Sequence, residues 1–330
     1  MFHPESYSIA ILLMILSMIC WGSWANALKF TPRWPFQLFY WDYAAGVLLA
    51  SLLWGITAGN IHPGPTSFFS DLHSADTRHW LLALLGGAIF NLANILLVAA
   101  IEIAGLAVAF PLGIGLALVV GVGINYLIAP KGSPILLFAG VALVVIAIVV
   151  DSVAYKRRDS EKKSSSSRGI WLSVVCGLLM GSFYPLVASA GSGGNGFRPY
   201  AVVFVFSIGV AISTIPINSI LMRKPLTVSP PVSFKEFFAS PLKYHLLGII
   251  GGAVWCTGAV ASFVAAHAQV VGPAVSYAIG QGATMISAFW GVVVWGEFAE
   301  APKRARSLLP LMLALFIFGI VTIAIAPLFS

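Results

Sequence analysis

Acidic and basic side chains are scarce in this sequence, and their scarcity decides its broad class. Only 9% of the 330 residues are charged and 59% are hydrophobic, whereas a soluble domain carries about 25% charged residues. A soluble domain is therefore excluded. Cysteine is equally rare: Cys20, Cys176 and Cys256 each lie in an apolar run without metal-ligand spacing. We expect small buried hydrophobic residues there rather than a redox or metal site.

The first residues and the net charge argue against two further interpretations. The segment MFHPESYS contains no Lys or Arg, so the apolar run after it lacks the basic flank of a cleaved signal peptide and is expected to remain as a membrane span. The formal net charge of +7 would suit an acidic partner, but the basic residues lie in loops and at span ends. Neither a nucleic-acid partner nor a cofactor is expected.

Long apolar runs are what the chain has in abundance. A helix needs about 20 apolar residues to cross a hydrocarbon core of ~30 Å, and runs of that length recur along the whole sequence. The predicted fold is all-α and integral to the membrane, with ten transmembrane helices. The predicted spans are residues 7–29, 38–58, 79–101, 104–127, 133–155, 169–190, 198–222, 244–267, 270–296 and 306–328.

One polar segment divides the spans into two groups of five. Residues 156–168, KRRDSEKKSSSSR, are charged and Ser-rich and contain no apolar side chain. This composition predicts a solvated, flexible linker. The predicted domains are a first five-helix repeat over residues 1–155, the cytoplasmic linker over 156–168, and a second five-helix repeat over 169–330.

Lysine and arginine are concentrated on one predicted side of the membrane. With ten spans, fifteen of the eighteen basic residues share one side, and Arg78, Lys131 and Arg198 lie on the other. The positive-inside rule assigns the fifteen to the cytoplasm and both termini to the non-cytoplasmic side of an inner or plasma membrane. Because each half holds an odd number of spans, the second half enters the membrane the opposite way up. The two halves are therefore predicted to form a 5+5 inverted-topology repeat.

Two stretches half a chain apart share a pattern of small residues. Residues 86–127 and 251–293 both begin with Gly-Gly-Ala and both read as a pair of spanning helices. Phe110 with Gly113-Ile114-Gly115 corresponds to Tyr277 with Gly280-Gln281-Gly282, and the offset drifts only from 165 to 167 residues. A duplicated helical hairpin is typical of transporters built from internal repeats.

Polar side chains at membrane depth mark the candidate ligand site, because a polar group in hydrocarbon costs free energy unless it is paired or lines a cavity. Near the middle of the spans, amides, hydroxyls and aromatic rings dominate, and no central Lys or Arg is present to bind an anion. A small neutral polar ligand is therefore expected. The predicted lining residues are Trp24, Asn26, Asn91, Asn94, Trp255, Tyr277 and Gln281.

Some of these residues have a purely structural alternative. Asn91 and Asn94 lie one helical turn apart on one face, where they could simply hold the third span against a neighbour. Gln281 lies between two glycines. That position is either a loosened turn that exposes backbone carbonyl groups or a tight contact with the fourth span.

Ion coupling usually requires a charged residue within the spans. Asp42, about one turn inside the second span, is the candidate for ion coupling or gating, and Lys29 ends the first span on the same side. A structural ion pair between them is favoured over a proton-coupling carboxylate. Glu102, Asp151 and Glu297 lie near span ends and are expected to be interfacial.

Three segments carry a resemblance to known families: Cys20-Trp-Gly-Ser-Trp-Ala-Asn26, Phe39-Tyr-Trp-Asp-Tyr43 and Gly86–Asn125. Together with the span arrangement, they resemble the drug/metabolite transporter superfamily, and within it the glucose/ribose-porter-type sugar transporters, the ureide permeases and the L-rhamnose/proton symporters. The resemblance covers nearly the whole chain. It implies import of a small polar metabolite through a cavity between the halves, and it favours a functional carboxylate at Asp42.

The combined prediction is a secondary active transporter that moves a small neutral polar metabolite by alternating access, with proton coupling left open. A sugar is the first choice of substrate, a ureide or nucleobase-like compound the second, and export of amphiphilic drugs the third. An enzyme would need a nucleophile with a base, paired carboxylates or metal ligands at one depth, and a receptor would need a signalling domain. The sequence offers neither, so no enzyme is expected, and lipids surround a monomer or homodimer.

Overall fold

The computed structural model describes residues 1–2, 4–61, 67–158, 167–227, 229–268 and 271–329. Within these residues, ten helical segments are long and apolar enough to cross a membrane, which confirms the predicted all-α membrane fold. Their helices are α1 (Tyr7–Ser23) with α2 (Asn26–Lys29), α3 (Phe36–Ile56), α5 (Thr77–Ala104), α6 (Leu106–Ala109) with α7 (Leu116–Ile128), α8 (Pro134–Arg158), α9 (Ser167–Ala190), α10 (Pro199–Arg223), α12 (Leu242–His267), α13 (Gly272–Gly280) with α14 (Ala283–Phe289), and α15 (Lys303–Arg306) with α16 (Leu309–Ile325).

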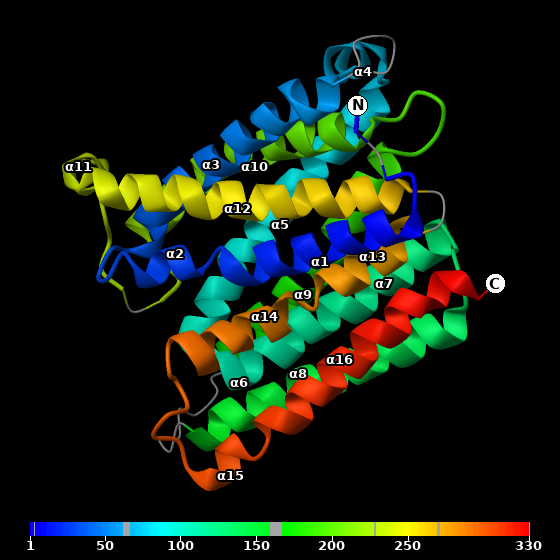
Figure 1. Ribbon diagram of the computed structural model, residues 1–330. Coiled ribbons are helices and arrows are strands. Elements are labelled where there is room, and N and C mark those ends of the chain that lie inside the picture. The colour runs from blue at the N-terminus through cyan, green and yellow to red at the C-terminus, as the bar shows by residue number, and fades with distance from the viewer. Residues whose placement is uncertain (3, 62–66, 159–166, 228, 269–270, 330) are drawn as a thin grey trace.

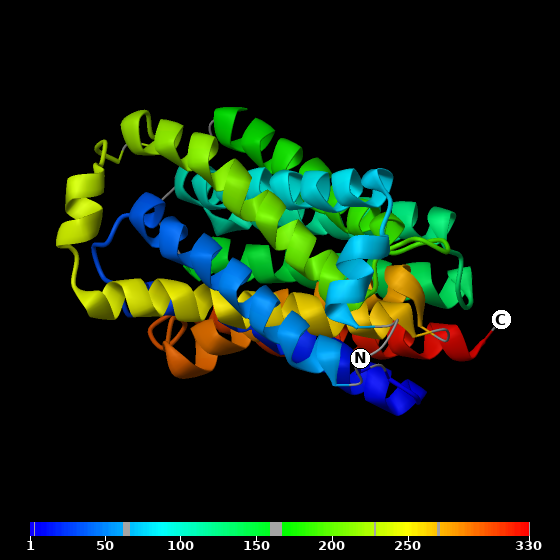
Figure 2. The same ribbon diagram turned by 90° about the horizontal axis from the view of Figure 1, so that it is seen from above.

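The helices form one elongated bundle with two ends (Figure 1, Figure 2). The end that contains Lys29, Arg158, Arg223 and Lys303 is called the basic end here. Both chain termini lie at the other end, the terminal end, together with the short helix α4 (Phe68–Ser74). The short helix α11 (Phe234–Ala239) lies across the basic end. As a consequence of five spans per half, α1 and α9 run in opposite directions through the bundle.

The turn between the third and fourth spans lies later than the sequence suggests. We expected the third span to end at residue 101, but α5 continues to Ala104 and ends at Gly105, whose φ is 77°. Only glycine adopts this left-handed conformation without strain. The predicted end at residue 101 was therefore three residues too early, because the conformation of Gly105 is what ends the helix.

The two halves of the sequence are interleaved in space. The helices α1 and α3 of the first half pack on α12 of the second, and the helices α9 and α10 of the second half pack on α5 of the first. This arrangement gives two bodies: body A contains α1, α3, α12, α13 and α14, and body B contains α5, α6, α7, α9 and α10. A separate pair, α8 and α16, packs side by side along one edge of the bundle.

Glycines let the crossing helices approach until their backbones touch. A Cβ added at Gly252 would overlap the carbonyl oxygen of Tyr43, and one at Gly87 would overlap the carbonyl oxygen of Phe206. The first contact joins α12 to α3, and the second joins α5 to α10. Small residues at such crossings are typical of membrane bundles, where close van der Waals contact replaces the hydrophobic effect between helices.

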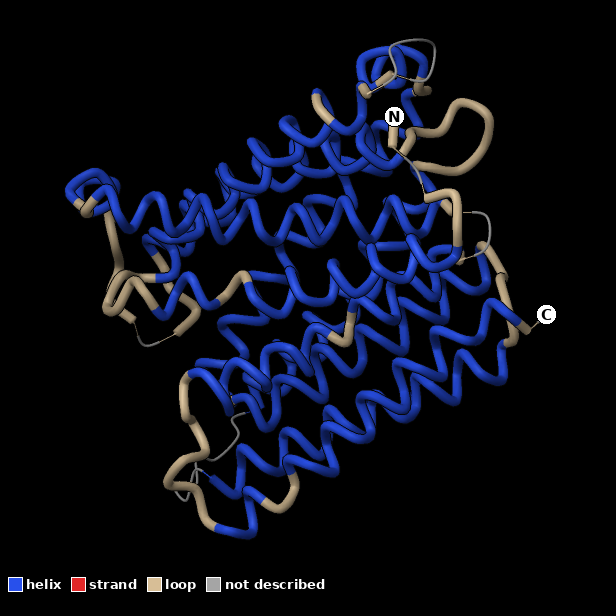
Figure 3. The backbone as a smooth tube through the Cα atoms, in the orientation of Figure 1, coloured by secondary structure: helices blue, strands red, loops and turns tan. Residues whose placement is uncertain are grey.

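Two spans lose regular helical geometry at matching positions. The π-helical turn Phe110–Gly115 separates α6 from α7, and Gln281 with Gly282 separates α13 from α14. Figure 3 shows the second break in mid-bundle. These are the segments whose glycine patterns correspond in the sequence, so the same local composition interrupts the helix in both halves.

The predicted linker lies mostly outside the described residues. Residues 156–158 continue α8 as regular helix and residues 167–168 already belong to α9, so the helical spans extend further into the polar segment than predicted. The three cysteines are free and buried.

We predict that Gly252→Ala and Gly87→Ala lower stability to a similar extent, because in each the new methyl group overlaps a neighbouring backbone. Overpacking of this kind typically costs about 1–3 kcal/mol. The measurement is the thermal unfolding midpoint in detergent. Gly123→Ala is the control, because a Cβ at this helical position meets nothing within 4 Å. Unchanged midpoints for both variants would contradict the prediction.

Candidate functional site

A cavity of about 540 Å³ lies in the middle of the bundle. Helices of both bodies enclose it: α1, α12 and the α13–α14 segment on one side, and α5, α9 and the Phe110–Gly115 turn on the other. Its lining extends from Met180 and Trp255 in mid-bundle to the exposed residues Ala25 and Glu102, so the cavity opens at the basic end. Small-molecule sites typically have volumes of about 300–1,000 Å³, and this cavity falls within that range.

Aromatic rings form one side of the cavity, which we call the aromatic floor: Trp21, Phe90, Phe183 and Trp255. Trp255 is central to it. Its ring centroid lies 4.2 Å from that of Phe90 and 5.9 Å from that of Trp21, to which it is stacked. The Trp21 indole N–H donates to the Trp255 carbonyl oxygen at 3.2 Å and so fixes α1 against α12. Such rings offer apolar faces on which a flat ligand can stack.

Amide and hydroxyl groups line the cavity beside the floor. Asn94 enters from α5, whereas Gln281 and Thr284 enter from the break between α13 and α14. The Thr284 hydroxyl donates to the Gln281 carbonyl oxygen at 3.1 Å. Among the described residues, the side-chain amide of Gln281 and the indole N–H groups of Trp24 and Trp255 have no hydrogen-bond partner. These groups are therefore available to a ligand.

Local backbone geometry explains how Gln281 reaches the cavity. The Gly282 N–H donates to the Ile279 carbonyl oxygen at 2.9 Å, a three-residue bond that tightens the helix before it breaks. Gly280 lies against Trp21, so the missing side chain of this glycine leaves room for the Trp21 ring of the aromatic floor. The carbonyl oxygens of Ile279, Gln281 and Gly282 all accept backbone hydrogen bonds, so the helix is interrupted by a tightened turn and not by the loosened turn with exposed carbonyl groups.

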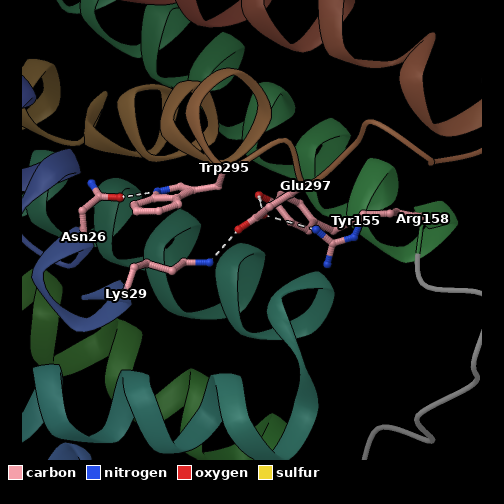
Figure 4. Close-up of polar contacts among 6 residues, drawn as sticks. All are labelled: Asn26, Lys29, Tyr155, Arg158, Trp295 and Glu297. Atoms are coloured by element: carbon pink, nitrogen blue, oxygen red, sulfur yellow. Dashed lines mark hydrogen bonds and ion pairs between the residues drawn. The ribbon is translucent and has the colours of Figure 1, made fainter. Parts of the chain in front are cut away.

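Four of the seven predicted lining residues border the cavity, and three do not. Those that border it are Trp24, Asn94, Trp255 and Gln281. Asn26 lies beside the cavity at the basic end. Its Oδ1 accepts a hydrogen bond from the Trp295 indole N–H at 2.7 Å (Figure 4). Its Nδ2 donates to the Ser23 carbonyl oxygen at 2.9 Å, so both ends of this amide are occupied.

Asn91 and Tyr277 are buried between helices. Asn91 accepts a hydrogen bond from the Tyr40 hydroxyl at 2.8 Å and donates to the Ser213 hydroxyl at 2.8 Å, so it holds α5 against α3 and α10, the alternative weighed from the sequence. The Tyr277 hydroxyl lies 3.3 Å from the Ala117 carbonyl oxygen and 3.2 Å from that of Met180. It joins α13 of body A to α7 and α9 of body B.

The expected ion pair between Asp42 and Lys29 was wrong, because each residue has a different partner. The Asp42 carboxylate lies 2.7 Å from Nδ1 of His245 on α12, and the ring of Trp34 packs edge-on against that imidazole. Sequence distance hid this contact, since Asp42 and His245 lie 203 residues apart. The pair lies outside the cavity lining, within body A.

Lys29 instead joins a cluster around Glu297 at the basic end (Figure 4). Its ammonium group lies 2.9 Å from Glu297 Oε1, and Oε2 accepts hydrogen bonds from Tyr155 at 3.0 Å and Arg158 at 3.2 Å. Partial burial acts to raise the pKa of Glu297, but these hydrogen bonds and the two positive charges outweigh it and hold the pKa below its ordinary 4.5. The carboxylate is therefore stabilised in its charged form.

Several lining residues were missed from the sequence. Trp21, Phe90, Phe183 and Glu102 all border the cavity. The signal lay in the repeat: Phe90 and Trp255 are separated by 165 residues, as are Gly87 and Gly252, so a ring at one position predicts a ring at the other. The exposed carboxylate of Glu102 was expected to be interfacial only. It lies at the mouth of the cavity and accepts a hydrogen bond from the Ser229 hydroxyl at 3.1 Å.

The arrangement suits recognition of a small molecule. The described lining contains no Lys or Arg, and the part of the chain that the structure describes holds no group of three or more His, Cys, Asp or Glu side chains able to bind a metal ion. Ten spanning helices around a cavity that opens at one end define a membrane transport protein.

Comparisons with known proteins give the family. A profile described as "Sugar transport protein" matches residues 49–326, and the chain belongs to this family. It is 24% identical to ureide permease 1 of Arabidopsis thaliana over 97% of each of the two chains. It is 23% identical to ureide permease 2 of the same organism over 96% of each chain. A solved crystal structure, 17% identical over 96% of each chain, has the same fold with a TM-score of 0.58.

These findings confirm a multi-pass membrane transporter and not an enzyme, because the family and the relatives are transporters. The predicted resemblance to sugar transporters and ureide permeases is likewise confirmed. Membership of the drug/metabolite transporter superfamily is consistent with these matches and stays a prediction.

We predict that Glu297→Gln removes a pH-dependent part of the stability. Because the folded pKa of Glu297 lies below 4.5, its contribution is present above that value and is lost as the pH falls through the lower folded pKa. The stability difference between wild type and variant should therefore shrink on acidification, as measured by thermal unfolding. Glu300→Gln, on the same exposed loop, is the control. A difference that stays constant with pH would rule out the charged cluster as its source.

Proposed function

We propose that the protein is a permease for a ureide or a similar cyclic urea. The observation that carries the proposal is the combination, in one cavity, of uncommitted amide and indole N–H groups with an aromatic floor. A ureide presents N–H donors and C=O acceptors in one plane, so Asn94 and Gln281 can bind its edges while the rings contact its faces. The absence of Lys and Arg from the described lining argues against an anionic ligand.

The relatives support the ureide ahead of the sugar that we first favoured. Ureide permeases from Arabidopsis match nearly the whole chain, and the cavity suits flat ligands. A sugar remains the second candidate, because the family description names sugar transport and because amides and indoles also bind hydroxyl groups. Export of amphiphilic drugs is the third candidate: the cavity lining is mostly apolar and would suit such ligands, but the relatives are ureide permeases.

We further propose that residues 1–155 and 169–330 are inverted five-helix repeats, and that transport proceeds by alternating access as bodies A and B, each built from helices of both repeats, move against each other. Paired glycine contacts support the repeat: Gly46 of α3 meets Ile249 of α12, and Gly209 of α10 meets Leu84 of α5 in the same way. With the basic end in the cytoplasm, both termini lie outside it and the cavity opens inward. An inner or plasma membrane is the proposed location.

Asp42 is the proposed coupling group, acting with His245. The two side chains form a compact, half-buried acid–base pair with a 2.7 Å contact, and removing a proton from or adding one to such a pair changes how α3 and α12 are held together. Lys29 is proposed to act in gating through Glu297.

The first prediction concerns the substrate. Allantoin should raise the thermal unfolding midpoint of the purified protein more than uracil, glucose or ribose, because binding to the folded state stabilises it by mass action. Gln281→Leu should weaken allantoin binding roughly 2- to 10-fold per lost hydrogen bond.

A second variant of the lining is paired with a matched control. Thr284→Val changes the lining, whereas Thr322→Val removes an equivalent helix-bound hydroxyl from an exposed site on α16. Only the first should alter binding. Stabilisation by a sugar with no response to allantoin would replace the ureide with the sugar.

The second prediction concerns coupling. Asp42→Asn should abolish the pH dependence of uptake into proteoliposomes while allantoin still stabilises the purified variant, because Asp42 does not line the cavity. Asp76→Asn, at the exposed terminal end, is the control. Uptake by Asp42→Asn that keeps the wild-type pH profile would exclude Asp42 as the coupling group.

A further inference from the structure

A chain of hydrogen bonds leads from a backbone carbonyl group on α10 to the cavity wall. The Ser213 hydroxyl lies 2.7 Å from the Gly209 carbonyl oxygen, and Asn91 Nδ2 lies 2.8 Å from that hydroxyl. The Tyr40 hydroxyl lies 2.8 Å from Asn91 Oδ1, and Asn94 Nδ2 lies 3.3 Å from Tyr40. Of the four side chains, only Asn94 borders the cavity.

The direction of every bond in this chain is set at its buried end. A carbonyl oxygen can only accept, and two oxygens 2.7 Å apart require a proton between them, so the Ser213 hydroxyl donates to Gly209. Its oxygen is then left to accept from Asn91, which must present its NH₂ group there and its carbonyl oxygen to Tyr40. The Tyr40 hydroxyl therefore donates to Asn91 and can only accept from Asn94.

Asn94 is thereby held with its NH₂ group turned toward Tyr40 and its Oδ1 left without a partner among the described residues. An amide that was free to rotate by 180° would offer the ligand a donor or an acceptor equally well. This one offers an acceptor. Gln281, on the opposite body, has no such constraint on its amide.

We infer that Tyr40, Asn91 and Ser213 are positioning residues that fix the Asn94 amide and so make the site select ligands with an N–H donor at that wall. The inference deepens the proposed function and rests on it, since a ureide supplies such an N–H donor. A ligand with a ring oxygen in the same place would put two acceptor oxygens against each other, and these form no hydrogen bond. Tyr40, Asn91 and Ser213 are not part of the described cavity lining.

The test uses two neutral rings of the same size, ethyleneurea and ethylene carbonate, which differ in having two N–H groups or two oxygens. Thermal shift titrations at millimolar concentration give the ratio of their affinities. We expect the wild type to prefer the urea by at least about tenfold. In Tyr40→Phe, and in the double variant Ser213→Ala/Thr214→Val, which also removes the Thr214 hydroxyl that donates to Asn91 Oδ1 at 3.2 Å, the Asn94 amide can turn. The ratio should then fall at least about threefold, toward unity.

Ser207→Ala is the matched control, because Ser207 lies on the same helix and donates to its own backbone at Val203, 2.7 Å away, without joining the chain. It should keep the wild-type ratio even if it lowers stability. Unchanged ratios in Tyr40→Phe and in Ser213→Ala/Thr214→Val, or no preference for the urea in the wild type, would overturn the inference. If allantoin binds the wild type but the affinity ratio of ethyleneurea to ethylene carbonate is unchanged in the variants, only the inference is overturned. If the protein responds to sugars and not to allantoin while that ratio still changes as expected, only the proposed function is overturned.

Discussion

A polar group inside a membrane bundle must find its partner within the protein, because the hydrocarbon supplies none. This constraint separates the two asparagines of α5, which lie one turn apart. Asn91 has both ends of its amide occupied by hydroxyl groups of α3 and α10, whereas Asn94 has only its NH₂ end occupied and keeps an oxygen at the cavity. What remains unpaired after the helices have packed is what a ligand can bind. The ligand-binding groups of the cavity are thus the polar atoms that have no hydrogen-bond partner within the protein, and the selectivity of the cavity follows from which atoms these are.

Packing of the crossings depends on a second condition, that helix backbones can touch. Gly252 against Tyr43 and Gly87 against Phe206 bring α12 onto α3 and α5 onto α10. Neither glycine lies at the contact between Tyr40 and the asparagines, which joins α3 to α5 through side chains. A larger residue at either glycine would separate the helix pair that the glycine joins.

The sequence predicted the number of spans and their type, since hydropathy reports directly on burial in lipid. It also predicted the depth of the site, and depth alone found Trp24, Asn94, Trp255 and Gln281. Depth does not give the direction in which a side chain points. Asn91 and Tyr277 have the right depth and face other helices. The partner of Asp42 was beyond reach for a related reason, because proximity of Asp42 to His245 is created by the crossing of two helices that are far apart in the chain.

Matched positions of the proposed repeat do different work at the two ends of the bundle. Phe110 of body B lines the open cavity at the basic end, whereas its counterpart Tyr277 lies on carbonyl groups of α7 and α9 and closes the space between the bodies on the other side.

The Tyr184 hydroxyl adds to this closure by its 2.9 Å contact with Ser262 on α12. At the basic end, the contacts made by Asn26 and Lys29 stay on the side of α14 and the loop after it, with Trp295 and Glu297 as partners, so they do not bridge the cavity mouth to body B. If the halves are inverted copies, Phe110 can take the packed environment of Tyr277 while Tyr277 takes the open environment of Phe110. This exchange converts the observed conformation into one open at the terminal end, with no change in the packing inside either body. The asymmetry between Phe110 and Tyr277 is thus the part of the structure that transport has to reverse.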